Sequence, residues 1–260
     1  MRIVLGLEYC GVGFCGWQSQ QQGCGVQDAL ETAMAAIAGE KIRVTTAGRT
    51  DTGVHAAFQV VHFDTDVKRP LSAWVRGVNS HLPAGVAVLW AREVGEDFHA
   101  RFGAMQRGYR YVLLNHAVRP GLNQGLIGWH HNPLDAAAMN AAAALLIGQH
   151  DFTAFRAAEC QAKSPVKDLR LLQIERRGDY LLCDFRADGF LHHMVRNLMG
   201  SLIQVGSGAH PPAWIREILD GRDRTRAAPT FDAAGLYLTH IRYPAHFALP
   251  ETSERWAFAI

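Results

Sequence analysis

The sequence has no long hydrophobic run and no recognisable export signal. No apolar stretch approaches the roughly 20 residues that a membrane-spanning helix needs. The first residues, Met1, Arg2, Ile3 and Val4, enter a strand pattern directly and lack the features of a secretory signal. We therefore expect a cytoplasmic protein with no membrane contact.

The net charge is small, and cysteines are few. A formal net charge of +2 over 260 residues does not by itself indicate a nucleic-acid partner, so an RNA-binding surface would have to come from local clusters of arginine. Five cysteines without a framework spacing favour unpaired thiols in a reducing compartment. No metal is expected, because the metal motifs are missing and the adjacent His192 and His193 would diverge by about 100° on a helix.

What the sequence does contain is enough apolar material for a core. With 48% hydrophobic residues, the chain can form one large domain or two smaller ones. Alternation of Ile3, Leu5, Leu7 and Tyr9 predicts a first strand with one buried face. The following patterns predict a helix from Val26, strands at 42–46 and 58–64, a helix over 71–78 and a strand at 86–94. The element order is β-α-β-β-α-β.

A similar series follows from Gly108. It comprises a strand at 109–114, a helix over 133–147 with Asn132 as N-cap and Pro133 in the first turn, a hairpin of strands 169–176 and 180–187, helices over 190–205 and 211–219, and a strand at 236–243. Two successive ferredoxin-like units explain this order, which makes the fold class α+β. We place the domains at 1–104 and 105–260 and expect the tail from Phe247 to be loosely attached.

Gly11, Gly13 and Gly16 spell a dinucleotide-binding pattern after the first strand. That pattern works only when its last glycine opens a helix that receives the pyrophosphate. Here a polar segment follows, and helical spacing begins only near Val26. A nicotinamide-dependent oxidoreductase is therefore the less favoured alternative.

A candidate catalytic segment lies at residues 47–56, where Asp51 is the only acid and is held between Gly48 and Gly53. The segment connects two predicted strands, and functional side chains are common on such connections. The simpler alternative is a turn in which the Asp51 side chain bonds to its own backbone. Composition alone leaves both alternatives open.

The segment Gly-Arg-Thr-Asp-x-Gly-Val-His that starts at Gly48 resembles the signature of the tRNA pseudouridine synthase A family. Four further blocks resemble that family in the same order, at 98–102, 109–111, 192–197 and 235–238, and the resemblance runs from Tyr9 to Tyr243. Cys10 departs from the family, which usually has Asp at this place. The family isomerises uridines 38, 39 and 40 in the anticodon arm of tRNA.

The resemblance implies a fold, partners and a mechanism. The two ferredoxin-like halves would form one continuous, mostly antiparallel sheet flanked by helices, with a central basic cleft. Asp51 would be the nucleophile, Arg196 its ion-pair partner, and Tyr109 the residue that stacks on the flipped base and takes the C5 proton. Leu236 would pack under the base. The enzyme would need no cofactor and would act as a homodimer bridged by tRNA.

The resemblance also implies contacts with tRNA. These are Arg49, which would enter the RNA to displace the base, together with Arg69, Phe98, His99, Ala100, Arg101, Phe102, His130, Glu159, Cys160, Gln161, Ala162 and Lys163. Arg107, Arg110, Arg156 and Lys167 are further candidates, whereas Tyr111 is expected in the core. A second alternative is an RNA-binding module of this fold that has lost catalysis.

Overall fold

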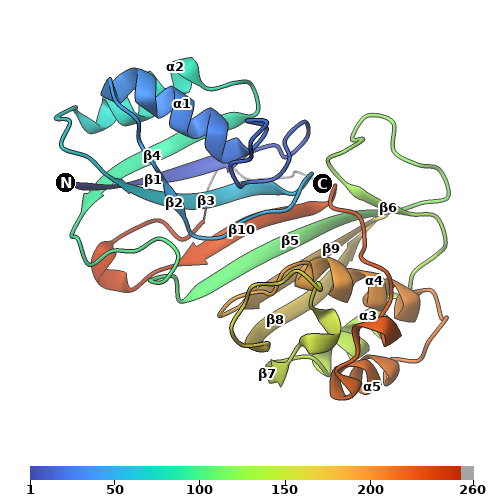
Figure 1. Cartoon of the computed structure of the whole chain (residues 1–260). Coiled ribbons are helices and arrows are strands. Elements are labelled where there is room, and N and C mark those ends of the chain that lie inside the picture. Colours follow the sequence, from blue (N-terminus) through green and yellow to red (C-terminus); the bar gives the residue numbers. More distant parts are fainter. Residues whose placement is uncertain (253–260) are drawn as a thin grey trace. The chain divides into compact units, whose positions relative to one another are not determined.

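The computed structural model describes residues 1–252, which contain ten strands and five α-helices (Figure 1). The chain folds into two compact units. The first comprises Met1–Met105 and the described residues from Tyr237 onwards, and the second comprises Gln106–Leu236. The predicted α+β class is confirmed.

The first unit contains a sheet in the order β4-β1-β3-β10, with the short β2 paired to β3. Its strands are β1 Arg2–Tyr9, β2 Thr45–Thr46, β3 His55–Asp64, β4 Val86–Val94 and β10 Leu236–Arg242. β1 runs antiparallel to β3 and β4, whereas β10 runs parallel to β3. Apart from its first residue, Leu236, β10 belongs to the first unit, although the sequence grouped it with residues 105–260.

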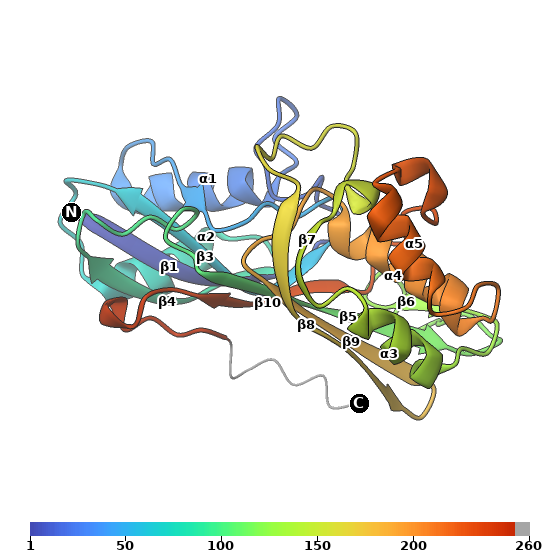
Figure 2. The same ribbon diagram turned by 90° about the horizontal axis from the view of Figure 1, so that it is seen from below.

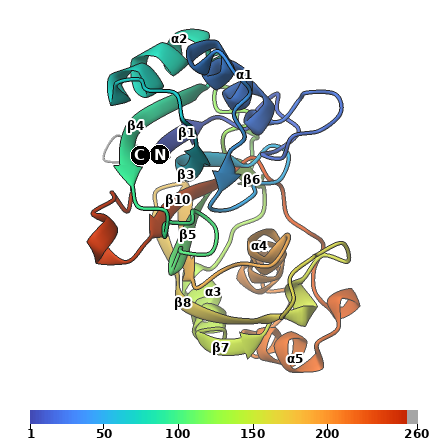
Figure 3. The ribbon, with the colours of Figure 1, turned by 60° about the vertical axis from the view of Figure 1, so that its left-hand side comes forward.

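Two helices cover one face of this sheet. α1 (Val26–Ala38) lies beside α2 (Val78–His81), which continues a π-helical turn η1 (Ala73–Gly77) (Figure 3). The Trp74 side chain is fully buried, and its ring meets the Phe63 ring edge-on at 4.9 Å. The predicted order β-α-β-β-α-β is confirmed for this unit.

The prediction that β1 has only one buried face is wrong, because residues 3–7 are all buried. On the second face, the Phe98 ring meets the His62 ring edge-on at 5.9 Å, and the Ala100 amide donates to His62 Nδ1 at 3.2 Å. The Trp90 ring also crosses β1 at Gly6, where a Cβ would lie 2.1 Å from the indole. A strand covered on both faces has no need of polar alternation.

The second unit contains a sheet in the order β5-β9-β8-β7. Its strands are β5 Gln106–Asn115, β7 Gly148–Asp151, β8 Val166–Arg177 and β9 Tyr180–Ala187, and a short β6 (Gly128–His130) pairs in parallel with β5. The predicted hairpin is present and turns at Gly178, whose φ is 57°. β6 and β7 were not predicted, because strands of three or four residues show no usable alternation.

The second unit contains three helices: α3 (Ala136–Ala144), α4 (Met194–Gly206) and α5 (Trp214–Gly221) (Figure 2). Asn132 is not the N-cap of α3. Instead, the Asp135 carboxylate accepts from the amides of Ala137 and Ala138 at 2.8 and 3.1 Å. A carboxylate at this position satisfies amides that have no partner within the helix.

α4 begins four residues later than predicted. His193 has φ 61°, in the left-handed region, so it ends a turn and precedes the helix. His192 and His193 therefore do not diverge along a helix, and their ring centroids lie 4.0 Å apart. The prediction that these two histidines diverge by about 100° on a helix is therefore wrong.

The segment after β10 is attached to it where it is described. A short 3-10 helix, η4 (Ala245–Phe247), is followed by chain that returns to β10, where the Ile241 amide donates to the Glu251 carbonyl at 3.0 Å. The expectation of a loose tail is thus wrong for residues 251 and 252, and its part at 253–260 lies outside the described residues. Within residues 1–252, no helix combines the length and apolar character needed to cross a membrane.

Candidate active site

Asp51 lies on the connection between β2 and β3, where the sequence predicted it. A tight turn follows it, in which the Val54 amide donates to the Asp51 carbonyl at 3.1 Å and Gly53 has φ 79°. Thr50 is buried, whereas its neighbours Arg49 and Asp51 are exposed and half-buried, respectively. The two charged side chains therefore remain accessible beside a buried one.

Hydrogen bonds from three parts of the unit hold this connection. Tyr9 Oη at the end of β1 lies 2.8 Å from Thr50 Oγ1, and Gln59 Nε2 of β3 donates to the Gly48 carbonyl at 2.7 Å. The Trp17 amide donates to the Thr50 carbonyl at 3.0 Å. The backbone that carries Asp51 is thereby fixed on both sides of Arg49.

The glycine-rich loop between β1 and α1 packs directly on the connection that carries Asp51. At Gly16, whose φ is 89°, a Cβ would lie 2.7 Å from the Thr50 carbonyl oxygen and 3.1 Å from the Asp51 carbonyl carbon. α1 starts only at Val26. Gly16 thus permits close packing against Asp51 and does not open the helix that a dinucleotide site needs.

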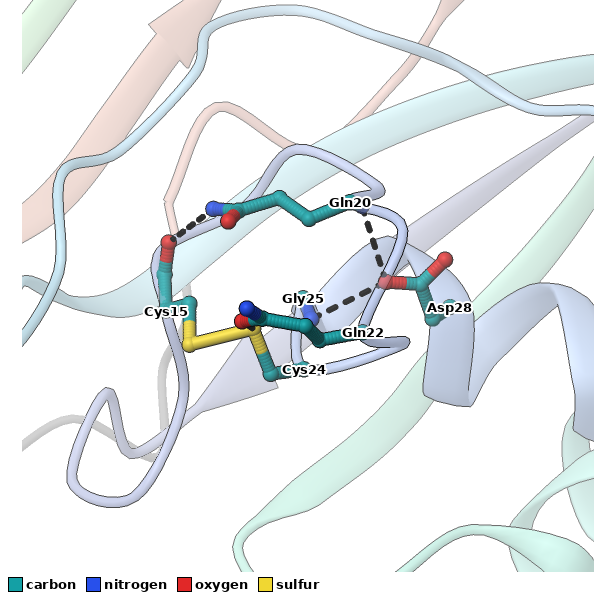
Figure 4. Close-up of a disulfide and its surroundings, with 6 residues drawn as sticks. All are labelled: Cys15, Gln20, Gln22, Cys24, Gly25 and Asp28. Atoms are coloured by element: carbon teal, nitrogen blue, oxygen red, sulfur yellow. Dashed lines mark hydrogen bonds between the residues drawn. A yellow bond between two sulfur atoms is a disulfide. The ribbon is translucent and has the colours of Figure 1, made fainter.

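The same loop is closed by a disulfide between Cys15 and Cys24, whose Cα atoms lie 5.4 Å apart (Figure 4). The Asp28 carboxylate accepts from the amides of Gly25 and Gln20 at 3.0 and 3.3 Å and so ties the loop to α1. The prediction of unpaired thiols is wrong for this pair. It is right for the remaining three cysteines, which are Cys10, Cys160 and Cys183.

His55 and Tyr237 stabilise the end of the connection, a role that the sequence did not reveal. His55 is 1% exposed, its Nδ1 accepts from the Gly11 amide at 2.9 Å, and its ring stacks on Tyr237 at 4.5 Å. Burial raises the pKa of the Tyr237 phenol, which therefore stays neutral. The available signals were the positions of His55 in the segment 47–56 and of Tyr237 in the block 235–238.

The predicted RNA contacts of the first unit differ in exposure. Phe98 and Ala100 are fully buried, whereas Arg101 and Phe102 are exposed, with the Arg101 guanidinium 5.6 Å from the Phe102 ring centroid. Arg69 is also exposed, and its Nε donates to a carbonyl of α1 at 3.2 Å. In the 98–102 block, the accessible side chains are thus mainly a cation and an aromatic ring.

In the second unit, β5 carries the three predicted residues of the 109–111 block. Tyr109 is half-buried, and its ring meets the Phe190 ring edge-on at 5.2 Å. Tyr111 is fully buried, which confirms its predicted place in the core, and burial raises its pKa. Arg110 forms a bidentate ion pair with Asp184, in which both hydrogen bonds are 2.7 Å long.

Arg196 lies in the first turn of α4 and is linked twice to Phe231. Its Nε donates to the Phe231 carbonyl at 2.9 Å, and its own carbonyl accepts from the Phe231 amide at 3.1 Å. The next residue, Asn197, is fully buried, and its Nδ2 donates to the Phe155 carbonyl at 2.8 Å. Arg224 donates to Asn197 Oδ1 at 3.0 Å. Asn197 lies in the 192–197 block, although the sequence gave it no role, and Arg224 was not singled out.

The remaining predicted contacts of the second unit lie on short or irregular segments. His130 is on β6, and burial lowers its pKa. Arg156 Nη2 donates to the Cys160 carbonyl at 2.5 Å and the Ala162 carbonyl at 3.3 Å, which shapes the segment 159–163. In that segment, Cys160 is buried and Ala162 is half-buried, whereas Glu159, Gln161 and Lys163 are exposed. Leu236, at the start of β10, is 4% exposed.

The predicted site residues are divided between the two units. Arg49, Asp51, Arg69 and the block from Phe98 to Phe102 belong to the first unit, and Tyr109, His130, the block from Glu159 to Lys163, Arg196 and Leu236 belong to the second. Within the first unit, Arg49 and Asp51 share one connection. The ion pair of Asp51 with Arg196 stays a prediction.

Known proteins resemble the chain over almost its entire length. A family model described as tRNA pseudouridine synthase matches residues 7–103 and 142–244. A protein named tRNA pseudouridine synthase A from Thiobacillus denitrificans is 79% identical over 259 residues, with 100% of each chain covered. Proteins of the same name from Chromobacterium violaceum and Dechloromonas aromatica are 60% and 57% identical, each covering 98% of this chain and 97% of the relative. The chain therefore belongs to the tRNA pseudouridine synthase family, a family of isomerases.

Proposed function

We propose that the chain converts uridines 38, 39 and 40 in the anticodon arm of tRNA to pseudouridine. The observation that carries this proposal is the 79% identity, over the full length of both chains, with a protein named tRNA pseudouridine synthase A. The accessible Asp51 beside an exposed Arg49 supports it. We propose that the enzyme acts in the cytoplasm, where its tRNA substrate is modified.

Asp51 is the proposed nucleophile. Its carboxylate attacks the target nucleoside at the base or at the sugar, and the bond between N1 and the ribose carbon breaks. The uracil turns, its C5 bonds to the same ribose carbon, and the bond to the Asp51 carboxylate breaks, which restores the free carboxylate. C5 loses its proton and N1 gains one, so the product has the same atoms as the substrate. Atoms and electrons balance without a redox partner, so the reaction requires no cofactor. A carboxylate on a fixed connection suits this role, because a nucleophile must be both ionised and oriented.

The other proposed roles follow the chemistry of each side chain. Arg196 steadies the carboxylate of Asp51 through an ion pair, and its double link to Phe231 supports this role by fixing the start of its helix. Arg49 enters the RNA, because removing a base from the stack costs a few kcal/mol that protein contacts must offset. Tyr109 stacks on the flipped base and takes the C5 proton, and Leu236 forms the apolar floor beneath it.

The proposed partner is the anticodon arm of tRNA, bound by two chains as a homodimer. The exposed cations Arg49, Arg69, Arg101 and Lys163 support an RNA surface, because phosphate groups provide most of the affinity for RNA. Light scattering on the protein with and without tRNA measures the assembly. A mass of one chain at micromolar concentration would contradict the dimer.

The deciding experiment uses tRNA that carries tritium at uridine C5. The wild-type chain should release the label, and Asp51→Asn should abolish release while tRNA affinity stays within a few-fold, because the amide keeps the shape but not the nucleophile. Turnover by Asp51→Asn would remove Asp51 from its role. Binding without release by the wild type would favour the RNA-binding module, and mapping pseudouridines in tRNA from a deletion strain checks the three positions.

A further inference from the structure

Three buried polar side chains lie behind the connection that carries Asp51. Tyr9, Thr50 and Gln59 are 4%, 7% and 0% exposed, and they come from β1, the connection itself and β3. We refer to these three residues as the polar clamp. Buried polar groups are costly unless their hydrogen bonds are satisfied, so such a cluster needs an explanation.

The hydrogen bonds of the polar clamp have one consistent direction. The Gly48 carbonyl can only accept, so the group of Gln59 that faces it at 2.7 Å is the Nε2 amide. The second hydrogen of Nε2 is directed to Tyr9 Oη at 3.4 Å. The Val60 amide donates to Gln59 Oε1 at 3.1 Å, which fixes the side-chain amide from its other end.

Tyr9 completes the chain of bonds. Its oxygen accepts from Gln59, which leaves its own proton for Thr50 Oγ1 at 2.8 Å. Burial raises the pKa of Tyr9 to about 12, partly opposed by its bonds to Thr50 and Gln59, so the phenol remains a donor at neutral pH. The polar clamp therefore binds the connection at Gly48 and Thr50, one on each side of Arg49.

We propose that Tyr9, Thr50 and Gln59 are positioning residues, which set the orientation of the Asp51 nucleophile and of Arg49. The proposal rests on the proposed role of Asp51. The connection has only the two-residue β2 before it, so regular strand pairing does little to fix it. With Thr50 held inside, the adjacent Arg49 is exposed and the adjacent Asp51 is half-buried. Loss of the clamp would let the carboxylate vary in position without removing it.

The test compares Thr50→Val with Thr65→Val. Both threonines are buried in the first unit, at 7% and 6% exposure, and Thr65 Oγ1 accepts only a local bond from the Val67 amide at 3.1 Å. Thr50→Val should lower kcat by about 100-fold while KM for tRNA stays within about threefold, because misplacement of a reacting group by about 1 Å has effects of this size. Thr65→Val should leave both constants near wild type.

Rescue and a second variant separate positioning from a general loss of structure. Thr50→Ser keeps the hydroxyl and should recover most of kcat. Should Thr50→Val fail to fold, Tyr9→Phe provides the test, because it removes the hydroxyl that bonds to Thr50 and Gln59 and should also lower kcat with little change in KM. A kcat for Thr50→Val, or for Tyr9→Phe when that variant is used, no lower than that of Thr65→Val overturns the proposal.

Asp51→Asn, measured in parallel, tells the two proposals apart. An inactive Asp51→Asn with a fully active Thr50→Val refutes the polar clamp and leaves the nucleophile standing. An active Asp51→Asn refutes the nucleophile and, with it, the clamp, because no reacting carboxylate remains to be positioned. An inactive Asp51→Asn, a slow Thr50→Val and an active Thr50→Ser support both.

Discussion

At the scale of the residue, the site depends on how each charged side chain is held. Arg196 is held by Phe231 and precedes the fully buried Asn197, which bonds to Phe155, Arg224 and Thr230. The first turn of α4 is thus anchored to segments far away in the sequence. Such anchoring reduces the rotamer freedom that a flexible arginine would otherwise lose on forming an ion pair.

Replacement of Arg196 by alanine should cost both stability and activity. The Phe231 carbonyl would lose its donor, and the proposed partner Asp51 would lose its counter-charge. We expect the free energy of unfolding to fall by about 1 to 3 kcal/mol, and isomerase activity to be lost. Chemical denaturation and tritium release measure the two effects. The variant Arg196→Lys keeps the charge but not the planar guanidinium. Unchanged stability in Arg196→Ala would argue against the pairing of Arg196 with Asp51.

At the scale of the element, the segment 98–102 has two tasks. Its buried residues Phe98 and Ala100 cover the second face of the first unit's sheet, and its exposed residues Arg101 and Phe102 are proposed RNA contacts. His62 of β3 is the point of attachment, because its Nδ1 accepts from the Ala100 amide. Protonation of that nitrogen would break the bond.

The stability of the first unit should therefore depend on the charge of His62. Burial, followed by the charges of Arg2 and His99, lowers the pKa of His62 to about 4, and Asp64 opposes them. The unfolded chain, with a pKa of about 6.5, binds the proton first, so this stabilisation is complete above pH 6.5 and is lost as the pH falls through about 4.

His62→Asn keeps an acceptor for the Ala100 amide but does not titrate. Between pH 7 and pH 4, wild type should lose about 1 to 3 kcal/mol more unfolding free energy than His62→Asn. Urea titrations at a series of pH values measure the difference. Parallel curves for the two proteins would show that His62 contributes nothing to the pH dependence.

At the scale of the whole molecule, net charge says little about the partner. A balance of +2 hides the local placement of exposed arginines such as Arg49, Arg69 and Arg101. Other arginines are occupied within the protein, as Arg110 is by Asp184, although the sequence offered Arg110 as a further RNA candidate. Recognition of the proposed substrate, the anticodon arm, should therefore come from a limited set of phosphate contacts.

Affinity for tRNA should fall linearly on a plot of log K against log salt concentration. Each phosphate contact contributes about 0.7 to 0.9 to the slope, so Arg101→Ala should reduce the slope by about that amount. The matched control is Arg177→Ala, because Arg177 is exposed on the β8–β9 hairpin, is paired with Glu175 at 2.9 Å and is not a predicted contact. Fluorescence binding titrations measure both, and equal slopes for wild type and Arg101→Ala would remove Arg101 from the interface.

Some elements were predicted correctly from the sequence, and others were not. The bounds of β4 and β9 and the start of α1 at Val26 were predicted correctly, because alternation and helical spacing are properties of neighbours in the chain. Asp51 was correctly placed on a connection. The cap of α3 and the start of α4 were wrong, because several nearby polar residues were compatible with a cap and only the folded backbone selects Asp135 and His193.

The types and order of most elements could be predicted without coordinates, as could the α+β class, the connection that carries Asp51, and the family. Tertiary structure alone decided that Cys15 pairs with Cys24, that β1 is buried on both faces, and that Tyr9 and Gln59 meet behind Thr50. The difference comes from the separation along the chain over which each kind of interaction acts. Periodicity records interactions within a few residues, whereas these contacts depend on where the chain returns after nine residues or after fifty.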